Sequence, residues 1–389
     1  MNSKFKHIDL KLIKPDFGSN LTKLILDLDY LRKRKIEGTT CPVLFYQLKK
    51  IFHLMESIGS LRIEGNRTTL IEYVEQKIDN KSDKKNENVI EIENNEKALS
   101  FIDENIDRIK IDRAFLSHIH IILTKNLSIP SIGEGSRNPG DYRKINVVIH
   151  GSSHCPPESV LVNSYMDELI KFINNDDPPQ YDLLKVAIAH HRFSWIHPFD
   201  NGNGRVVRLL TYAMLIKGGF KVDVGQRILN PVAIFCNDRE KYYKYLSTAD
   251  SGNDEDILEW CEYVLSGLKN EINKIDNLLD YKFLREKIFL PSLNLARDKR
   301  YINDNEFKIL QLAVNKQIIS AGDIKTLFPD KIPAEISRMI RRLKEKGILQ
   351  SDSNNVRKYI FSFENNYLLR CIIEMLRNQN FISDMIYFG

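Results

Sequence analysis

One segment, residues 205–217, constrains the fold of this chain more than any other. Its apolar residues lie on every side of a helix: Val206, Val207, Leu209, Leu210, Ala213, Leu215 and Ile216. A surface helix has a single apolar stripe, whereas a helix that is apolar all round is buried. Gly218 and Gly219 then end this helix. The chain must therefore supply several other helices that cover this one.

Further helical segments are available to cover it. Helical patterns are found over residues 42–58, 69–76, 113–124, 158–174, 183–193, 239–246, 257–274 and 277–288. Residues 77–96 are polar and rich in Asn, Lys and Glu, which indicates a solvated loop or a loose helix. Residues 145–150 are short and β-branched and give the best strand of the first 300 residues. The sequence therefore predicts a mainly helical body with one β excursion.

The composition excludes several classes of protein. Hydrophobic residues make up 42% of the chain and charged residues 28%, which argues against wholesale disorder. No run approaches the roughly 20 apolar residues that a membrane span needs, and the N-terminus lacks the apolar stretch of a secretory signal. The five cysteines are scattered without metal or redox spacing. We therefore expect reduced thiols and a cytoplasmic protein without a membrane partner.

Residues 306–361 differ from the body. Helical patterns over 306–314, 321–328 and 334–346 precede two strands at 348–350 and 359–361, which is the order of a winged helix-turn-helix. Residues 297–358 carry 14 Lys and Arg against 8 Asp and Glu. The outer face of the third helix holds Arg338, Arg341, Arg342, Lys344 and Lys346. This face either contacts DNA or is a solvated face of a packing or dimerising domain.

The chemistry is concentrated in residues 196–208. Gly202 and Gly204 allow tight turns and let a ligand approach the backbone closely. The loop opens into the buried helix, whose first N–H groups and dipole form an anion site. Arg205 and Arg208 share one face there and suit a polyphosphate. His197 precedes the loop and can accept a proton from a hydroxyl group. The stretch therefore predicts a phosphate-binding site, here called the cradle, formed by Gly202, Gly204, Arg205 and Arg208. His197 is the base beside it.

This stretch resembles the Fic-domain signature, HPFx[D/E]GN[G/K]RxxR. The matching residues are His197, Pro198, Phe199, Gly202, Asn203, Gly204, Arg205 and Arg208. Residues 139–143 with 147–151 resemble the β-hairpin flap that aligns a target segment, on Val147, Val148 and Ile149. Residues 60–66 resemble the inhibitory motif [S/T]xxxE[G/N], on Ser60, Glu64 and Gly65. The resemblance covers roughly residues 40–270.

The resemblance implies transfer of AMP from ATP to a Ser, Thr or Tyr hydroxyl of a protein, with His197 as the general base. It assigns nucleotide binding to Gly202, Asn203, Gly204, Arg205, Val206, Val207, Arg208, Tyr242 and Tyr243. Gly204 favours nucleotidyl transfer, because family members with Lys there transfer phosphate. Glu64 would restrain the enzyme by pairing with Arg208. The implied fold is the helical Fic fold with its flap, followed by a winged helix.

The sequence patterns and the resemblance together predict a division of the chain. Residues 1–98 would form an N-terminal region with the inhibitory helix and 99–290 the catalytic core. Residues 297–365 would form the winged helix-turn-helix and 366–389 a last helix. The sequence leaves a homodimer open.

Asn201 departs from the family pattern, which has Asp or Glu at this position. An amide oxygen coordinates Mg²⁺ more weakly than a carboxylate does. The adjacent Asp200 is the rival ligand, so the Mg²⁺ site rests on Asn201 or Asp200. Two other functions remain open: a degenerate Fic-fold regulator that binds DNA, and a different activity on the same fold, such as removal of AMP.

Overall fold

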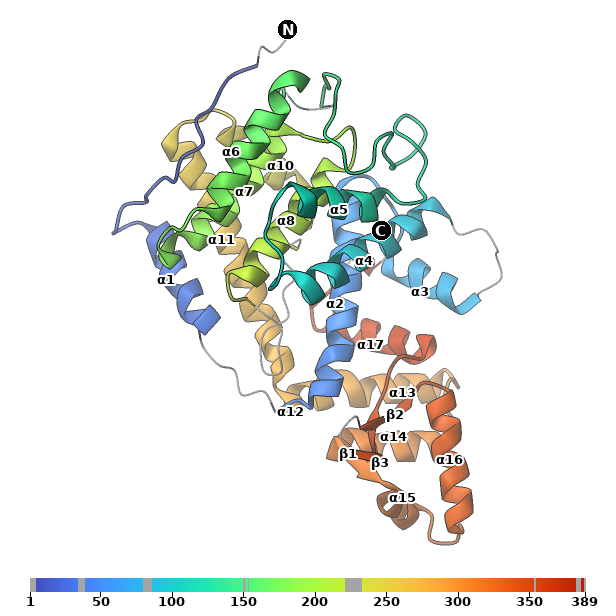
Figure 1. The fold of residues 1–389 in the computed structure, drawn as a ribbon. Helices are drawn as coiled ribbons and strands as arrows, with labels where there is room; N and C mark the ends of the chain where they lie inside the picture. Colours follow the sequence, from blue (N-terminus) through green and yellow to red (C-terminus); the bar gives the residue numbers. More distant parts are fainter. Residues whose placement is uncertain are drawn as a thin grey trace. The chain divides into compact units, whose positions relative to one another are not determined.

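The structure is a computed structural model that describes residues 5–33, 39–79, 86–149, 152, 154–220, 233–352, 355–382 and 386–387 (Figure 1). The chain divides into two compact units. The first consists of Met1–Lys35, Glu56–Arg67 and Asp83–Asn273, and the second of Ile36–Met55, Thr68–Ser82 and Lys274–Gly389. Helix α2 (Pro42–Ile63) contributes residues to both units.

The first unit is helical over its described residues. Its helices are α1 (Asn20–Lys33), α4 (Glu87–Asn105), α5 (Arg113–Thr124), α6 (Val162–Asn174), α7 (Asp182–Ile196), α8 (Asn203–Lys217), α9 (Ala233–Cys236), α10 (Arg239–Ala249) and α11 (Asp254–Asp276), with short 3-10 turns at Ser159–Leu161 and Pro179–Tyr181. Helix α8 is the segment that the sequence predicts to be buried, and its side chains from Val206 to Ile216 are buried. Helices α4, α5 and α7 pack against it.

The second unit combines helices with a small sheet. Its helices are α3 (Leu70–Asp79), α12 (Tyr281–Phe283), α13 (Leu290–Asp298), α14 (Asp304–Lys316), α15 (Ala321–Leu327), α16 (Pro333–Glu345) and α17 (Asn366–Asn378), with a 3-10 turn at Asn277–Leu279 and a π-helix at Leu284–Phe289. Strands β1 (Ile318–Ser320), β2 (Leu349–Asp352) and β3 (Asn355–Phe361) form an antiparallel sheet in the order β1-β3-β2. Strand β1 was not predicted, because three residues are too few for an alternating pattern.

Three predicted elements differ in the structure. The polar segment 77–96 contains the first half of α4, whose inner face is buried at Val89, Glu91 and Ile92. The helix expected over 277–288 is a 3-10 turn, a short α-helix and a π-helix in succession. A proline cannot donate to the turn before it, and Pro291 follows the widened turns directly. The last helix, expected over 366–389, ends at Asn378, where Phe381 N–H bonds back to Leu376 O.

The strand expected over 145–150 is a further correction. Residues 145–149 do not pair with another strand among the described residues, and His150 lies outside them. Arg143, at the base of this segment, donates to Ile145 O at 3.0 Å, a carbonyl group that a strand ladder would otherwise use. The predicted flap is therefore an irregular loop over its described part.

All five cysteines are free thiols. Over the described residues, no helix combines the length and the hydropathy that crossing a membrane would require.

Candidate active site

The loop between α7 and α8 has two left-handed backbone positions. His197 follows the end of α7 with φ +52°, and Gly202 precedes α8 with φ +75°. The side-chain amide of Asn203 closes the loop from within, because it accepts from Phe199 N–H at 2.8 Å and donates to Phe199 O at 2.9 Å. These contacts hold His197 at the start of α8.

The N-terminus of α8 is an anion site that a carboxylate already approaches. The first N–H groups of a helix have no carbonyl partner within the helix. A Cβ placed on Gly204 would lie 2.1 Å from Oε1 of Glu64. Only glycine therefore lets the Glu64 carboxylate come this close to the helix end.

Arg208 is held by the segment that carries Glu64. Its Nη2 donates to Glu64 Oε1 at 2.7 Å and to Ser60 O at 3.0 Å, and its Nε donates to Ser60 Oγ at 2.8 Å. Burial opposes ionisation of Glu64, but the Arg208 guanidinium outweighs it and lowers the pKa of Glu64 below its usual value. Both groups of this pair are therefore charged at neutral pH.

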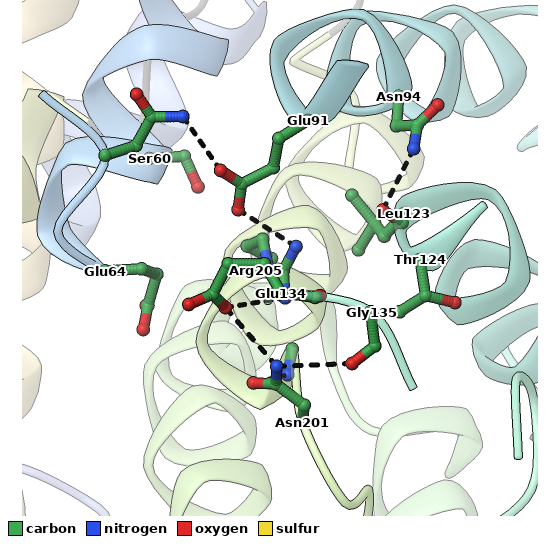
Figure 2. A network of polar contacts seen from close by, with 12 residues as sticks. Ser60, Glu64, Glu91, Asn94, Leu123, Thr124, Glu134, Gly135, Asn201 and Arg205 are labelled. Atoms are coloured by element: carbon green, nitrogen blue, oxygen red, sulfur yellow. Dashed lines mark hydrogen bonds and ion pairs between the residues drawn. The ribbon is translucent and has the colours of Figure 1, made fainter. Parts of the chain in front are cut away.

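Arg205 lies between two carboxylates, as Figure 2 shows. Its Nη1 donates to Glu91 Oε1 at 3.0 Å. Its Nη2 donates to the backbone carbonyl of Glu134 at 2.7 Å and lies 3.3 Å from the Glu134 carboxylate. The Arg205 side chain is fully buried, whereas Glu134 retains 46% exposure. Both arginines of the predicted cradle are thus ion-paired in this structure.

His197 is next to a buried arginine. Arg143 donates to His197 O at 2.8 Å and to Pro157 O at 2.6 Å, and its own N–H donates to Pro198 O at 2.8 Å. Burial, together with the charge of Arg143, lowers the pKa of His197 to about 4. The imidazole is therefore neutral at pH 7 and able to accept a proton.

The side chains of Asp200 and Asn201 are both hydrogen-bonded. Asp200 accepts from Ser136 Oγ at 2.6 Å and from Arg137 N–H at 2.9 Å. Asn201 turns its Nδ2 toward Glu134 and Gly135, while its Oδ1 accepts from Gly202 N–H at 2.7 Å. A cation at Asn201 would require the amide to turn over, so this arrangement does not fit a metal ion there. The Mg²⁺ site stays a prediction.

The remaining predicted residues have unequal access. Val206 and Val207 point their side chains into the core. Tyr242 is buried, and its hydroxyl lies 3.0 Å from Nε2 of His190. Tyr243 is 41% exposed on α10. Of the two tyrosines predicted to contact the nucleotide, only Tyr243 has a surface that a ligand could stack on.

Sequence reasoning missed four residues of this site: Glu91, Glu134, Arg143 and His120. Glu91 lies in the segment read as polar, although the spacing of Val89, Ile92, Leu99 and Ile102 would have placed it on a buried helix face. His120 is a buried residue of α5 whose Nε2 lies 3.1 Å from Asn201 O. No local signal identifies Glu134 or Arg143 as contacts of the cradle, because both act across long loops.

The contacts of His120 predict a loss of stability in acid. Nδ1 accepts from Gly140 N–H at 2.9 Å, so the ring is neutral with its proton on Nε2. Burial lowers the pKa of His120 to about 4. Between pH 6.5 and 4, the unfolded chain binds a proton that the folded chain does not. The free energy of unfolding therefore decreases as the pH is lowered through this window. His120 alone should reduce it by about 2 kcal/mol between pH 7 and pH 5.

Urea unfolding at pH 7 and pH 5 measures this loss. His120→Gln removes the titrating group. The free energy of unfolding that this variant loses between pH 7 and pH 5 should therefore be about 2 kcal/mol smaller than the wild-type loss. An equal loss in the variant and the wild type would contradict the assignment.

The segment that carries this site is similar to known proteins. Residues 110–215 match the Fic/DOC family model. The chain is 31% identical over 148 residues to a protein adenylyltransferase Fic of Nematostella vectensis. The aligned residues make up 38% of this chain and 29% of that protein. The chain is 30% identical over 152 residues to a probable protein adenylyltransferase of Aquifex aeolicus, or 39% of this chain and 42% of that one. The chain thus spans less than half the length of these relatives.

Solved structures agree on the fold. A Fic family protein from Desulfovibrio desulfuricans superposes with a TM-score of 0.54 at 18% identity, over 92% of this chain and 99% of that chain. A Fic domain containing signaling protein from Bacteroides thetaiotaomicron gives a TM-score of 0.50 at 19% identity, over 67% and 98%. Residues 110–215, which contain His197 and the cradle, therefore match the Fic/DOC family in sequence, within a chain whose fold is similar to that of solved Fic proteins.

Proposed function

We propose that the chain transfers AMP from ATP to a hydroxyl group of a protein. The observation that carries the proposal is the arrangement at the start of α8, where a neutral imidazole adjoins a helix N-terminus and two buried arginines. The relatives are named as protein adenylyltransferases, which supports this proposal. ATP is the substrate that these relatives imply.

The step balances with the residues present. His197 accepts the proton of a Ser, Thr or Tyr hydroxyl, and the oxygen forms a bond to the α-phosphorus of ATP. The bond between that phosphorus and the pyrophosphate oxygen breaks, and pyrophosphate leaves. Arg205, Arg208 and the first N–H groups of α8 stabilise the negative charge of the phosphates.

The target would dock on residues 145–149. Val148 is 81% exposed and Ile145 is 55% exposed, and Val147 and Ile149 are half-buried. This loop pairs with no other strand among the described residues, and its exposed apolar side chains suit contact with a peptide segment. Arg143 fixes the base of this loop next to His197, so a docked segment would bring its hydroxyl toward the imidazole.

In this proposal Glu64 restrains the reaction. Its carboxylate pairs with Arg208 and approaches Gly204, and a triphosphate would have to displace it from both. The same carboxylate could instead position a water molecule for removal of AMP from a modified target, which makes the reverse reaction the second candidate activity on this site.

Labelled ATP tests the proposal. The 389-residue chain and its Glu64→Gly variant are incubated with cell lysate and ATP labelled at either the α- or the γ-phosphate. Label should appear on protein only from the α position. Label from the γ position would indicate phosphate transfer, and no label from either position would contradict the proposed function.

The second unit has a separate candidate function. Helix α16 exposes Arg338, Arg341, Arg342 and Lys344, and the exposed Lys346 follows its last residue. If residues 297–365 act as a winged helix, this face would contact the phosphates of DNA. Binding of a DNA duplex should then weaken steeply with salt and should weaken uniformly across sequences when two of these residues are replaced. Binding that ignores salt would exclude this role.

The predicted metal site can be tested by stability. Asn201→Asp places a carboxylate where the amide now lies 3.3 Å from Glu134, so the two carboxylates should repel by about 1 kcal/mol in metal-free buffer. If Mg²⁺ binds between the two carboxylates, it should raise the melting temperature of the variant back toward the wild-type value. The wild type, with its amide donating to Glu134, should show no such dependence. A variant with the same melting temperature in both buffers would argue against a metal at this position.

A further inference from the structure

The end of helix α2 is closed by a tight pair of backbone hydrogen bonds. Asn66 N–H donates to Leu61 O and Gly65 N–H donates to Arg62 O, both at 3.1 Å. Gly65 lies between them with φ +106°, which completes a Schellman motif. This motif fixes the directions of the two side chains that flank the glycine, those of Glu64 and Asn66.

The two flanking side chains reach different arginines of the cradle. Glu64 bonds directly to Arg208. Asn66 bonds through its Nδ2 to Oε2 of Glu91 at 2.8 Å, and Oε1 of the same carboxylate accepts from Arg205 at 3.0 Å. One turn of chain thus connects to both arginines, once directly and once through Glu91.

The second connection is buried. Glu91 is 3% exposed and Arg205 is fully buried. Among the described residues, the Nε of Arg205 has no hydrogen-bond partner, although the atom is buried. A buried N–H without a partner costs free energy unless a ligand accepts from it. Arg205 is therefore oriented by carboxylates on its Nη atoms, with its Nε left for a further acceptor (Figure 2).

We propose that Asn66 and Glu91 form a second latch, which holds the Glu64 segment closed by connecting it to Arg205. This inference rests on the proposed function. Glu91 is a positioning residue with two roles: it orients Arg205, and its other oxygen anchors Asn66. Release of Asn66 frees the α2 end, so Glu64 competes less effectively with a triphosphate for Arg208.

The electrostatics of Glu91 are consistent with this latch. Burial raises the pKa of Glu91 above its usual value, against the opposing effects of Arg205 and the Asn66 amide. The charged form of this carboxylate thus depends on the two groups that it connects. The Asn66 amide also donates to Asn88 O at 3.3 Å. Its loss leaves the ion pair between Glu91 and Arg205 in place, so a substitution at position 66 opens the latch without removing that pair.

The test compares Asn66→Ala with a matched control in two backgrounds, the wild-type 389-residue chain and its Glu64→Gly variant. The control is Asn94→Ala, because Asn94 lies on the same helix as Glu91 and donates to Leu123 O and Lys125 O rather than to the arginine network. The readouts are the Kd for ATP by calorimetric titration and the rate of auto-modification from α-labelled ATP.

We expect Asn66→Ala to tighten ATP binding and to speed auto-modification about tenfold in the wild-type background, the factor that one charge-assisted hydrogen bond supplies. In the Glu64→Gly background it should change neither, because the carboxylate that the latch holds is absent. The control should leave both quantities unchanged in both backgrounds. An equal factor in both backgrounds, no effect, or a loss of binding in the wild-type background would overturn the latch.

A second variant tests Glu91 itself. In the Glu64→Gly background, Glu91→Gln should weaken ATP binding several-fold with little change in the rate at saturating ATP, because Arg205 loses its anionic partner. Unchanged binding would remove Glu91 from the positioning role. If no variant transfers label while the ATP titrations follow these expectations, the proposed function fails and the latch stands.

Discussion

Replacement of His197 by alanine should reduce AMP transfer by about 10²–10⁴-fold while ATP binds nearly as before, because a positioned general base supplies a factor of that size. The imidazole lies outside the arginine network that would hold the phosphates, so its loss should affect the rate and not the affinity. The measurement is transfer from α-labelled ATP in the Glu64→Gly background, where restraint does not mask the chemistry. The Kd for ATP comes from a parallel titration.

His154→Ala is the matched control for this experiment. Its ring is 2.8 Å from Trp195 O and supports the same region without belonging to the cradle. We expect its rate to remain within a few-fold of the parent. Transfer by His197→Ala at the parent rate would show that another group removes the proton.

Replacement of Glu64 by glycine should increase auto-modification by one to two orders of magnitude. The Glu64–Arg208 contact is a charge-assisted hydrogen bond with one fully buried partner, worth about 1.5–3 kcal/mol. A triphosphate must replace it before Arg208 can bind phosphate, so its removal should strengthen ATP binding by a corresponding factor. Auto-modification and the Kd for ATP would both be measured.

Glu64→Gln separates charge from shape. The amide keeps the size of the side chain and can still accept from Arg208, so it should give an intermediate rate. A Glu64→Gly variant that transfers no faster than the wild type would exclude restraint by this residue. A variant that transfers AMP but cannot remove it would support the reverse reaction.

The parts of the site that the sequence predicted are those specified by short-range patterns. The all-apolar segment predicted the buried helix α8, and the Gly202 turn predicted the helix N-terminus beside it. The Arg208–Glu64 pair came from the resemblance of residues 60–66, not from their chemistry.

What the sequence did not predict are long-range contacts to those same residues. The contact of Glu91 with Arg205 joins positions 114 residues apart, and Arg143 reaches the carbonyl of a residue 54 positions later. No periodicity encodes such pairs. The amide orientation of Asn201 is also set from a distance, by the carboxylate of Glu134 and the carbonyl of Gly135.

The left-handed backbone at His197 favours glycine at a position where the proposed reaction needs histidine. A non-glycine residue in this conformation costs about 1 kcal/mol relative to glycine. His197→Gly should therefore melt at a higher temperature than His197→Ala, because both variants lose the imidazole and only glycine removes the backbone cost, a result that differential scanning calorimetry can check. Among substitutions at position 197, selection for thermal stability alone would favour glycine, which cannot accept a proton. Engineering of this chain must therefore select for activity as well as for thermal stability.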